Sequence, residues 1–122
     1  MVERPLPRVL IVDDQPEIAR ALSRVFAADA KVTVAQSGKD ALAQIETTSF
    51  DLVICDVMMP GMTGPELFER VKAIDAKTAA AFVFTTGGVD AHHEKELRAT
   101  GARWLTKPVE IRDLRKLLRP PG

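Results

Sequence analysis

Cysteine and aromatic residues are scarce in this sequence, and neither sign of charge is in excess. The 122 residues include one cysteine, no tyrosine and only 5% aromatic residues. One cysteine excludes an internal disulfide and agrees with a reducing, cytoplasmic setting. The 17 basic and 17 acidic side chains cancel. No excess of charge therefore favours direct nucleic-acid binding or attraction to a membrane surface.

Long apolar runs are missing as well. No stretch approaches the length of apolar sequence that spans a membrane. The first eight residues carry charges and prolines but no apolar segment, so they do not form a signal peptide. The composition, 46% hydrophobic and 28% charged, is typical of a globular protein. A chain of this length predicts one domain with a substantial core.

Strand-like and helix-like patterns alternate along the chain. Short runs that are apolar or rich in β-branched residues predict five strands, at residues 8–13, 31–35, 51–55, 79–85 and 102–106. Helical spacing predicts five helices, and four of them carry a clear apolar stripe. The stripes are Ile18, Leu22, Val25 and Phe26 in the first helix; Ala41, Leu42 and Ile45 in the second; Leu67, Val71 and Ile74 in the third; and Ile111, Leu114, Leu117 and Leu118 in the last.

The predicted helices follow the strands one by one. The first should run from Pro16 to about Asp29, the fourth from about Asp90 to Thr100, and the last should stop before Pro120. Five strand–helix units imply a doubly wound α/β domain, with a parallel sheet and helices on both faces. Residues 1–7 and 120–122 are expected to be short tails of this single domain, whose core covers about residues 8–119.

Acidic residues stand where two of the predicted strands end. The run Val9–Val12 leads into Asp13 and Asp14, and the run Leu52–Cys55 leads into Asp56. Ligands of open α/β sheets bind at this carboxyl edge. If the two strands are neighbours, three carboxylates repel one another across a small volume, and a hard divalent cation such as Mg²⁺ relieves that repulsion.

Two further strands end on residues that suit an anion. The fourth ends on Thr85 and Thr86, followed by Gly87, and the fifth ends on Lys107. A lysine can pair with a phosphate oxygen, while a hydroxyl and a backbone N–H can donate to others. Carboxylates, cation, lysine and hydroxyl around one point suit phosphoryl transfer onto an aspartate.

Four motifs in order carry a family resemblance: Val12–Pro16, Asp56–Gly64, Phe84–Gly88 and Trp104–Pro108. With these motifs the sequence resembles the receiver domain of two-component response regulators over about residues 8–119. The resemblance implies a flavodoxin-like sheet with strand order 2-1-3-4-5. It also implies a phosphorylatable signalling switch rather than a conventional enzyme.

The resemblance assigns roles to individual residues. Asp56 is expected to accept a phosphoryl group from a phosphohistidine, with Lys107 paired to that group and the Gly87 N–H donating to it. Mg²⁺ is expected on Asp13, Asp14, Asp56 and the backbone carbonyl of Met58. Thr86 matches the switch hydroxyl, with Thr85 as the alternative. Trp104 stands at the switch aromatic position, with plain core packing as the alternative. The bond between Lys107 and Pro108 resembles one that is commonly cis.

The expected partners are a sensor histidine kinase or its receiver-docking domain, and a downstream protein. The downstream protein should bind the face built by the fourth predicted helix, the fifth strand and the fifth helix, without direct contact to nucleic acid or membrane. Met58 and Gly88 flank the acceptor and the switch hydroxyl, and neither side chain can position a water. We therefore expect slow self-dephosphorylation.

Other functions stay open at this point. A pseudo-receiver would dock partners without phosphorylation, although the intact set of site residues argues against it. An aspartyl-phosphate phosphatase usually has a second acid two residues after its nucleophile, where this chain has Met58. No G-x-G-x-x-G follows the first strand, which disfavours a dinucleotide-binding module. The chain holds no output domain, so it is either a stand-alone regulator or part of a longer protein such as a hybrid histidine kinase.

Overall fold

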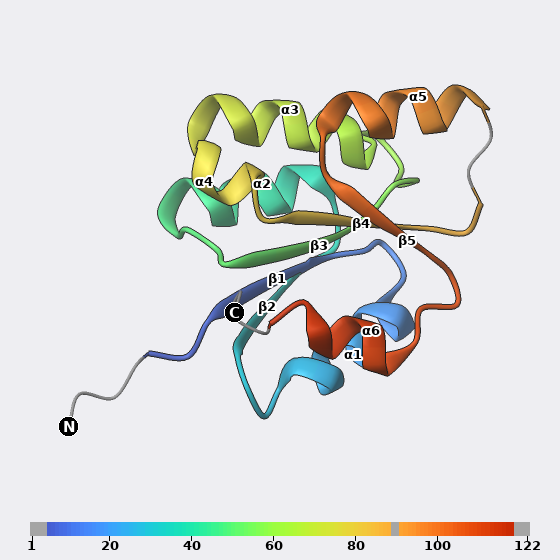
Figure 1. Ribbon diagram of the computed structural model, residues 1–122. Helices are drawn as coiled ribbons and strands as arrows, with labels where there is room; N and C mark the ends of the chain where they lie inside the picture. Colours follow the sequence, from blue (N-terminus) through green and yellow to red (C-terminus); the bar gives the residue numbers. More distant parts are fainter. Residues whose placement is uncertain (1–4, 89–90, 119–122) are drawn as a thin grey trace.

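One parallel sheet of five strands runs through the molecule, in the order β2-β1-β3-β4-β5 (Figure 1). The structure is a computed structural model that describes residues 5–88 and 91–118. The predicted helix start at Asp90 and most of the predicted tails lie outside these residues. The strands are β1 (Arg8–Val12), β2 (Lys31–Ala35), β3 (Leu52–Asp56), β4 (Phe82–Thr86) and β5 (Arg103–Thr106).

Helices cover both faces of this sheet. Two of them, α1 and α6, lie on one face, and the others lie on the opposite face (Figure 1). The helices are α1 (Pro16–Phe26), α2 (Gly38–Thr47), α3 (Gly64–Ile74), α4 (Ala76–Ala79), α5 (Ala91–Thr100) and α6 (Ile111–Lys116). The predicted doubly wound fold and its strand order are confirmed.

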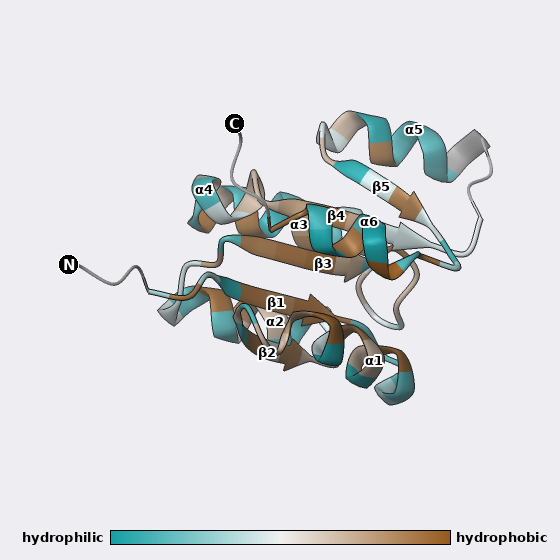
Figure 2. Cartoon of the chain, turned by 60° about the horizontal axis from the view of Figure 1, so that its bottom comes forward, coloured by the Kyte–Doolittle hydropathy of each residue, from teal (hydrophilic) through white to brown (hydrophobic). Residues whose placement is uncertain are grey.

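The two layers of helices enclose two separate cores because side chains alternate along each strand. In β1, Leu10 and Val12 point into the core under α2, α3 and α5, while Val9 and Ile11 point toward α1 and α6. All five residues of β3 are buried. Figure 2 shows β1 and β3 as hydrophobic along their length, as expected for strands covered on both faces.

Local sequence signals fix where the helices begin. Ser37 accepts a hydrogen bond from the Asp40 N–H at 3.1 Å and so caps α2. Thr63 caps α3, because its hydroxyl accepts from the Glu66 N–H and donates to the Glu66 carboxylate, both at 3.2 Å. These caps satisfy backbone donors that have no partner inside the helix.

The segment between α3 and β4 differs from the prediction. Residues Ala76–Ala79 form the short helix α4, and β4 begins at Phe82 rather than at Ala79. Alanine favours helices and is depleted in strands, which explains the difference. The prediction that Ile74 is buried was also wrong: it is the last residue of α3 and is 50% exposed.

Two other helices are shorter than predicted. α1 ends at Phe26, and a turn in which the Asp29 N–H donates to the Phe26 carbonyl replaces the expected last turn. α6 ends at Lys116, and Ile111 in its first turn is 56% exposed. Among the described residues, no helix has the length and apolar character needed to cross a membrane.

Asp75 ties this corner of the molecule together. Its carboxylate accepts hydrogen bonds from the hydroxyls of Ser49 and Thr78, both at 2.7 Å, and from the N–H groups of Lys77 and Thr78. The Thr78 hydroxyl in turn accepts from the Phe50 N–H at 3.1 Å. The bond from Ser49 and those from Thr78 lower the pKa of Asp75 to about 2.

Replacing Asp75 with Asn should destabilise the fold in a pH-dependent way. The folded-state pKa lies below its ordinary value, 3.8, so the carboxylate stabilises the protein fully above that pH and progressively less as the pH falls through about 2. Urea unfolding between pH 7 and pH 2 should give a lower midpoint for Asp75→Asn at neutral pH and converging midpoints in acid. Asp29→Asn, at an exposed turn, is the charge-matched control. A difference that persists unchanged at low pH contradicts this account.

Candidate functional site

Three aspartates meet at the carboxyl edge of the sheet. Asp13 and Asp14 follow β1, Asp56 ends β3, and these strands are neighbours with Val12 paired to Cys55. Each aspartate offers a carboxylate oxygen within 4.8 Å of the other two. Asp13 is 1% exposed and Asp56 is 7% exposed, so water solvates their charges poorly. The sequence-predicted cluster of acids therefore exists in the fold.

Asp13 is only partly satisfied. Its Oδ1 accepts a hydrogen bond from the Gln15 N–H at 2.9 Å, but its Oδ2 is buried without a hydrogen-bond partner. Within the described residues, this Oδ2 is the one buried side-chain polar atom without a hydrogen-bond partner. Burial raises the pKa of Asp13 and outweighs the Gln15 hydrogen bond, and the nearby Asp56 raises it further. An all-oxygen cluster with an unsatisfied oxygen fits a small hard cation.

Lys107 reaches the same cluster from the end of β5. Its Nζ lies 3.3 Å from Oδ1 of Asp56. The Lys107 N–H donates to the Thr86 carbonyl at 2.7 Å, which fixes the chain leaving β5 against β4. The peptide bond between Lys107 and Pro108 is cis, as the sequence resemblance implied. Three acids and the lysine are therefore brought together.

The two threonines at the end of β4 are both buried but have different surroundings. Thr85 is the neighbour of Asp56 in the pairing of β3 with β4. The Thr86 hydroxyl donates to the Gly88 carbonyl at 2.8 Å, and it accepts from the Gly88 N–H at 3.3 Å. The proton of Thr86 is thus engaged by its own loop in this structure.

The loop after β3 is shaped by its packing. Met59 is buried, whereas the Met58 side chain is 57% exposed. At Gly64, a Cβ would lie 2.8 Å from the Asp56 carbonyl oxygen and 3.0 Å from the Phe84 ring, so only glycine fits without a shift. Sequence reasoning gave Gly64 no role beyond the motif. Its need for glycine comes from a backbone approach between segments that the sequence alone does not place.

Comparison with known proteins agrees with this geometry. The family profile described as "Response regulator receiver domain" matches residues 9–119. The chain belongs to this family. It is a receiver domain of two-component systems, with a phosphorylatable signalling role.

Relatives of this receiver domain include proteins of very different length. It is 34% identical to "Sporulation initiation phosphotransferase F" of Bacillus subtilis, over 92% of this chain and 90% of that protein. It is also 34% identical to "Sensor histidine kinase GacS" of Pseudomonas protegens, over 92% of this chain but only 13% of that protein. The chemotaxis protein CheY4 of Vibrio cholerae has a similar structure, with a TM-score of 0.83 and 33% identity over 93% of this chain and 96% of that one.

Trp104 of this receiver domain packs against the hydrophobic core. It is partly buried, packs against the core under α3 and α5, and is paired with Phe84 in the β4–β5 register. Phe84 belongs to a cluster of edge-on and tilted rings with Phe68 and Phe82, with centroids 5.6 to 6.3 Å apart. Trp104 therefore adjoins the aromatic core rather than the metal-fitting cluster.

Cys55 is buried next to Asp56, as the sequence predicted. Its thiol donates to the Asp56 carbonyl at 3.3 Å. Burial, with help from Asp56 and Asp13, raises the pKa of the thiol well above its ordinary value. The thiol therefore stays uncharged and adds no negative charge to the site.

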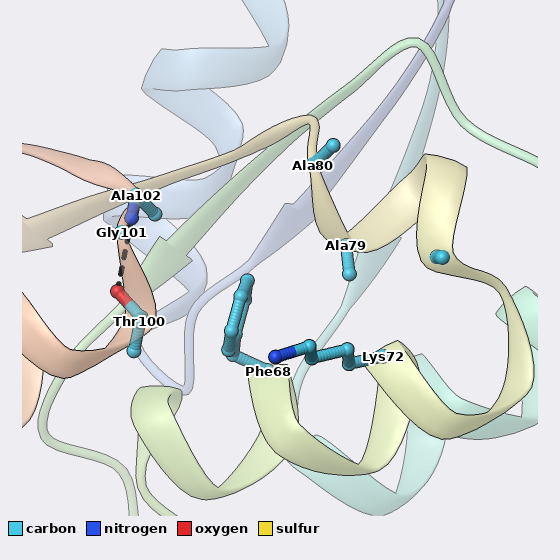
Figure 3. A pocket seen from close by; sticks show the side chains of 8 residues that line it. Phe68, Lys72, Ala79, Ala80, Thr100, Gly101 and Ala102 are labelled. Atoms are coloured by element: carbon cyan, nitrogen blue, oxygen red, sulfur yellow. Dashed lines mark hydrogen bonds between the residues drawn. The ribbon is translucent and has the colours of Figure 1, made fainter.

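Cavities occur at both ends of the sheet in this receiver domain. One of about 390 Å³ lies between α1 and the end of β5, and Thr85 and Lys107 contribute to its lining. Another, of about 350 Å³, lies at the amino ends of β4 and β5, where Figure 3 shows Phe68 and Lys72 facing Ala79 and the segment Thr100–Ala102. Of these two cavities, the one between α1 and β5 adjoins the candidate site, because Thr85 and Lys107 line it.

Proposed function

We propose that Asp56 accepts a phosphoryl group from the phosphohistidine of a sensor histidine kinase or its receiver-docking domain. The observation that carries this proposal is the placement of the Asp56 carboxylate. It lies 3.3 Å from Lys107 and within a cluster of acids in which one buried oxygen of Asp13 has no donor. A carboxylate between a fixed cation and a cation-fitting cluster is suited to attack on phosphorus.

The cation that fits this cluster is Mg²⁺. Asp13, Asp14, Asp56 and the backbone carbonyl of Met58 would hold it, because hard divalent cations prefer oxygen ligands. When bound, Mg²⁺ would neutralise the carboxylates and the charge on the phosphoryl oxygens. The unsatisfied Oδ2 of Asp13 supports this assignment, since without a cation its burial is a net cost.

The residues around Asp56 have separate roles in the phosphoryl transfer. A carboxylate oxygen of Asp56 forms the new bond to phosphorus while the bond from phosphorus to the imidazole nitrogen breaks, and the nitrogen keeps the electron pair. Lys107 pairs with a phosphoryl oxygen. Thr86 gives up its bond to the Gly88 carbonyl and donates to the phosphoryl group instead, together with the Gly87 N–H.

This exchange of hydrogen bonds provides the signal. Thr86 ends β4, and the loop after it leads into α5, so a new partner for Thr86 alters how α5 sits on β5. We propose that the face built by α5, β5 and α6 changes and that a downstream protein reads it, with Trp104 responding inside it. The receiver works in the cytoplasm and contacts neither nucleic acid nor membrane directly. Whether it acts alone or as part of a longer chain does not alter this chemistry.

A titration with Mg²⁺ and beryllofluoride, a mimic of the phosphoryl group, tests the proposal. Trp104 is the only tryptophan, so its fluorescence should change saturably as the Asp56 site fills. Asp56→Asn should abolish the change, whereas Asp51→Asn, at the opposite end of β3, should preserve it. If wild-type protein gives neither a fluorescence response nor Mg²⁺-dependent stabilisation, a docking module that works without phosphorylation explains the fold better.

Phosphorylated protein should lose its phosphoryl group slowly. Met58 has an exposed thioether and Gly88 has no side chain, so neither can orient an attacking water. Decay of the phosphorylated protein in Mg²⁺ buffer, with no phosphatase added, measures this lifetime. Met58→Asn supplies an amide that can hold water and should shorten the lifetime at least roughly tenfold, a modest part of what positioned groups contribute. Rapid decay of the unmodified protein contradicts the expectation.

A further inference from the structure

The Trp104 ring has an arginine beside it that the proposed function does not use. The Cζ atom of Arg98, on α5, lies 5.8 Å from the centroid of the Trp104 ring. The indole is packed against the core on its inner side and is paired with Phe84 across the strands. A guanidinium within about 6 Å of an indole is attracted by the ring, and Trp is the best aromatic partner for such a contact.

The position of Arg98 is itself set by a neighbour on α5. Nε and Nη2 of Arg98 donate to the same Oε1 of Glu94, at 3.1 and 2.6 Å. The two side chains are one helical turn apart and remain largely exposed, so the ion pair contributes little to stability. The pair nevertheless engages two nitrogens of the guanidinium whose Cζ lies beside the ring.

The sequence of α5 is mostly polar. In the part of α5 whose side chains the structure describes, residues 93–100, Leu97 is the buried one. In addition to the packing of Leu97, the contact of Arg98 with Trp104 joins α5 directly to β5. An element with few buried contacts shifts more easily than the rest of the fold.

We infer that Arg98 is a positioning residue that holds Trp104 and α5 in their resting arrangement. This inference rests on the proposed function, because it concerns how the phosphoryl signal passes from Thr86 to α5. Movement of α5 or of the indole separates the two groups, so the contact exists in one arrangement and is lost in the other. A contact made in only one of two states shifts the equilibrium toward that state.

Removing Arg98 should therefore make activation easier. In the Mg²⁺ and beryllofluoride titration, Arg98→Ala and Arg98→Met should lower the half-saturating concentration roughly two- to fivefold, as expected from the strength of exposed cation–π pairs. Arg98→Lys keeps a cation and should restore most of the wild-type value. Arg103→Ala is the matched control, because Arg103 precedes Trp104 on β5 and points to the other face of the sheet.

Quenching of the Mg²⁺-free proteins by acrylamide, which is uncharged, gives a second, independent readout. The indole should be quenched more readily in Arg98→Ala and Arg98→Met than in wild type or Arg103→Ala. Unchanged half-saturation in both Arg98 variants overturns the inference, even if they unfold at lower denaturant concentration, because that pattern describes a purely structural contact. A wild-type protein that does not respond to beryllofluoride overturns the proposed function as well. If wild type responds and the Arg98 variants have the same half-saturating concentration and the same quenching as wild type, only this inference is overturned.

Discussion

Mutual repulsion among three carboxylates is the constraint on which the rest of this structure depends. One carboxylate oxygen from each of Asp13, Asp14 and Asp56 lies within 4.8 Å of the other two, and the buried Oδ2 of Asp13 receives no hydrogen bond. Folding alone does not favour such a cluster, since the buried carboxylates of Asp13 and Asp56 lose water and face a third acid, Asp14. In the proposed function, a cation and a phosphoryl group that enter this cluster offset that cost, so one site can both bind and switch.

The sheet makes this costly arrangement possible. β1 and β3 are central and apolar, and their pairing brings the acids together at one edge, while β5 brings Lys107 to 3.3 Å from Asp56. Glycine at position 64 lets α3 approach the backbone carbonyl of Asp56 closely. The acids and the lysine thus lie at the ends of strands, whereas the proposed movement begins at Thr86, the last residue of β4, and reaches α5.

Much of this architecture was predictable because the signals are local or periodic. Apolar runs that end on Asp13 and Asp56 specified both the strands and the site, and the four motifs specified the strand order through family resemblance. The wrong predictions concern segments that have neither a clear periodic pattern nor a family motif. The alanine-rich run before β4 lacks periodicity, and Ile74 follows the apolar stripe although α3 ends there. The contact of Arg98 with Trp104 and the close approach at Gly64 join segments whose relative placement depends on the packed fold.

The most direct test of the central claim is the stability of Asp13→Asn with and without Mg²⁺. Asparagine keeps the acceptor for the Gln15 N–H but removes one charge and places a donor where the unsatisfied oxygen lies. In Mg²⁺-free urea unfolding, the variant should be more stable than wild type by roughly 1–3 kcal/mol, the usual cost of a buried unsatisfied polar group. Saturating Mg²⁺ should stabilise wild type and leave the variant nearly unchanged. A variant that is less stable without Mg²⁺, or that gains as much from Mg²⁺ as wild type, would contradict the account.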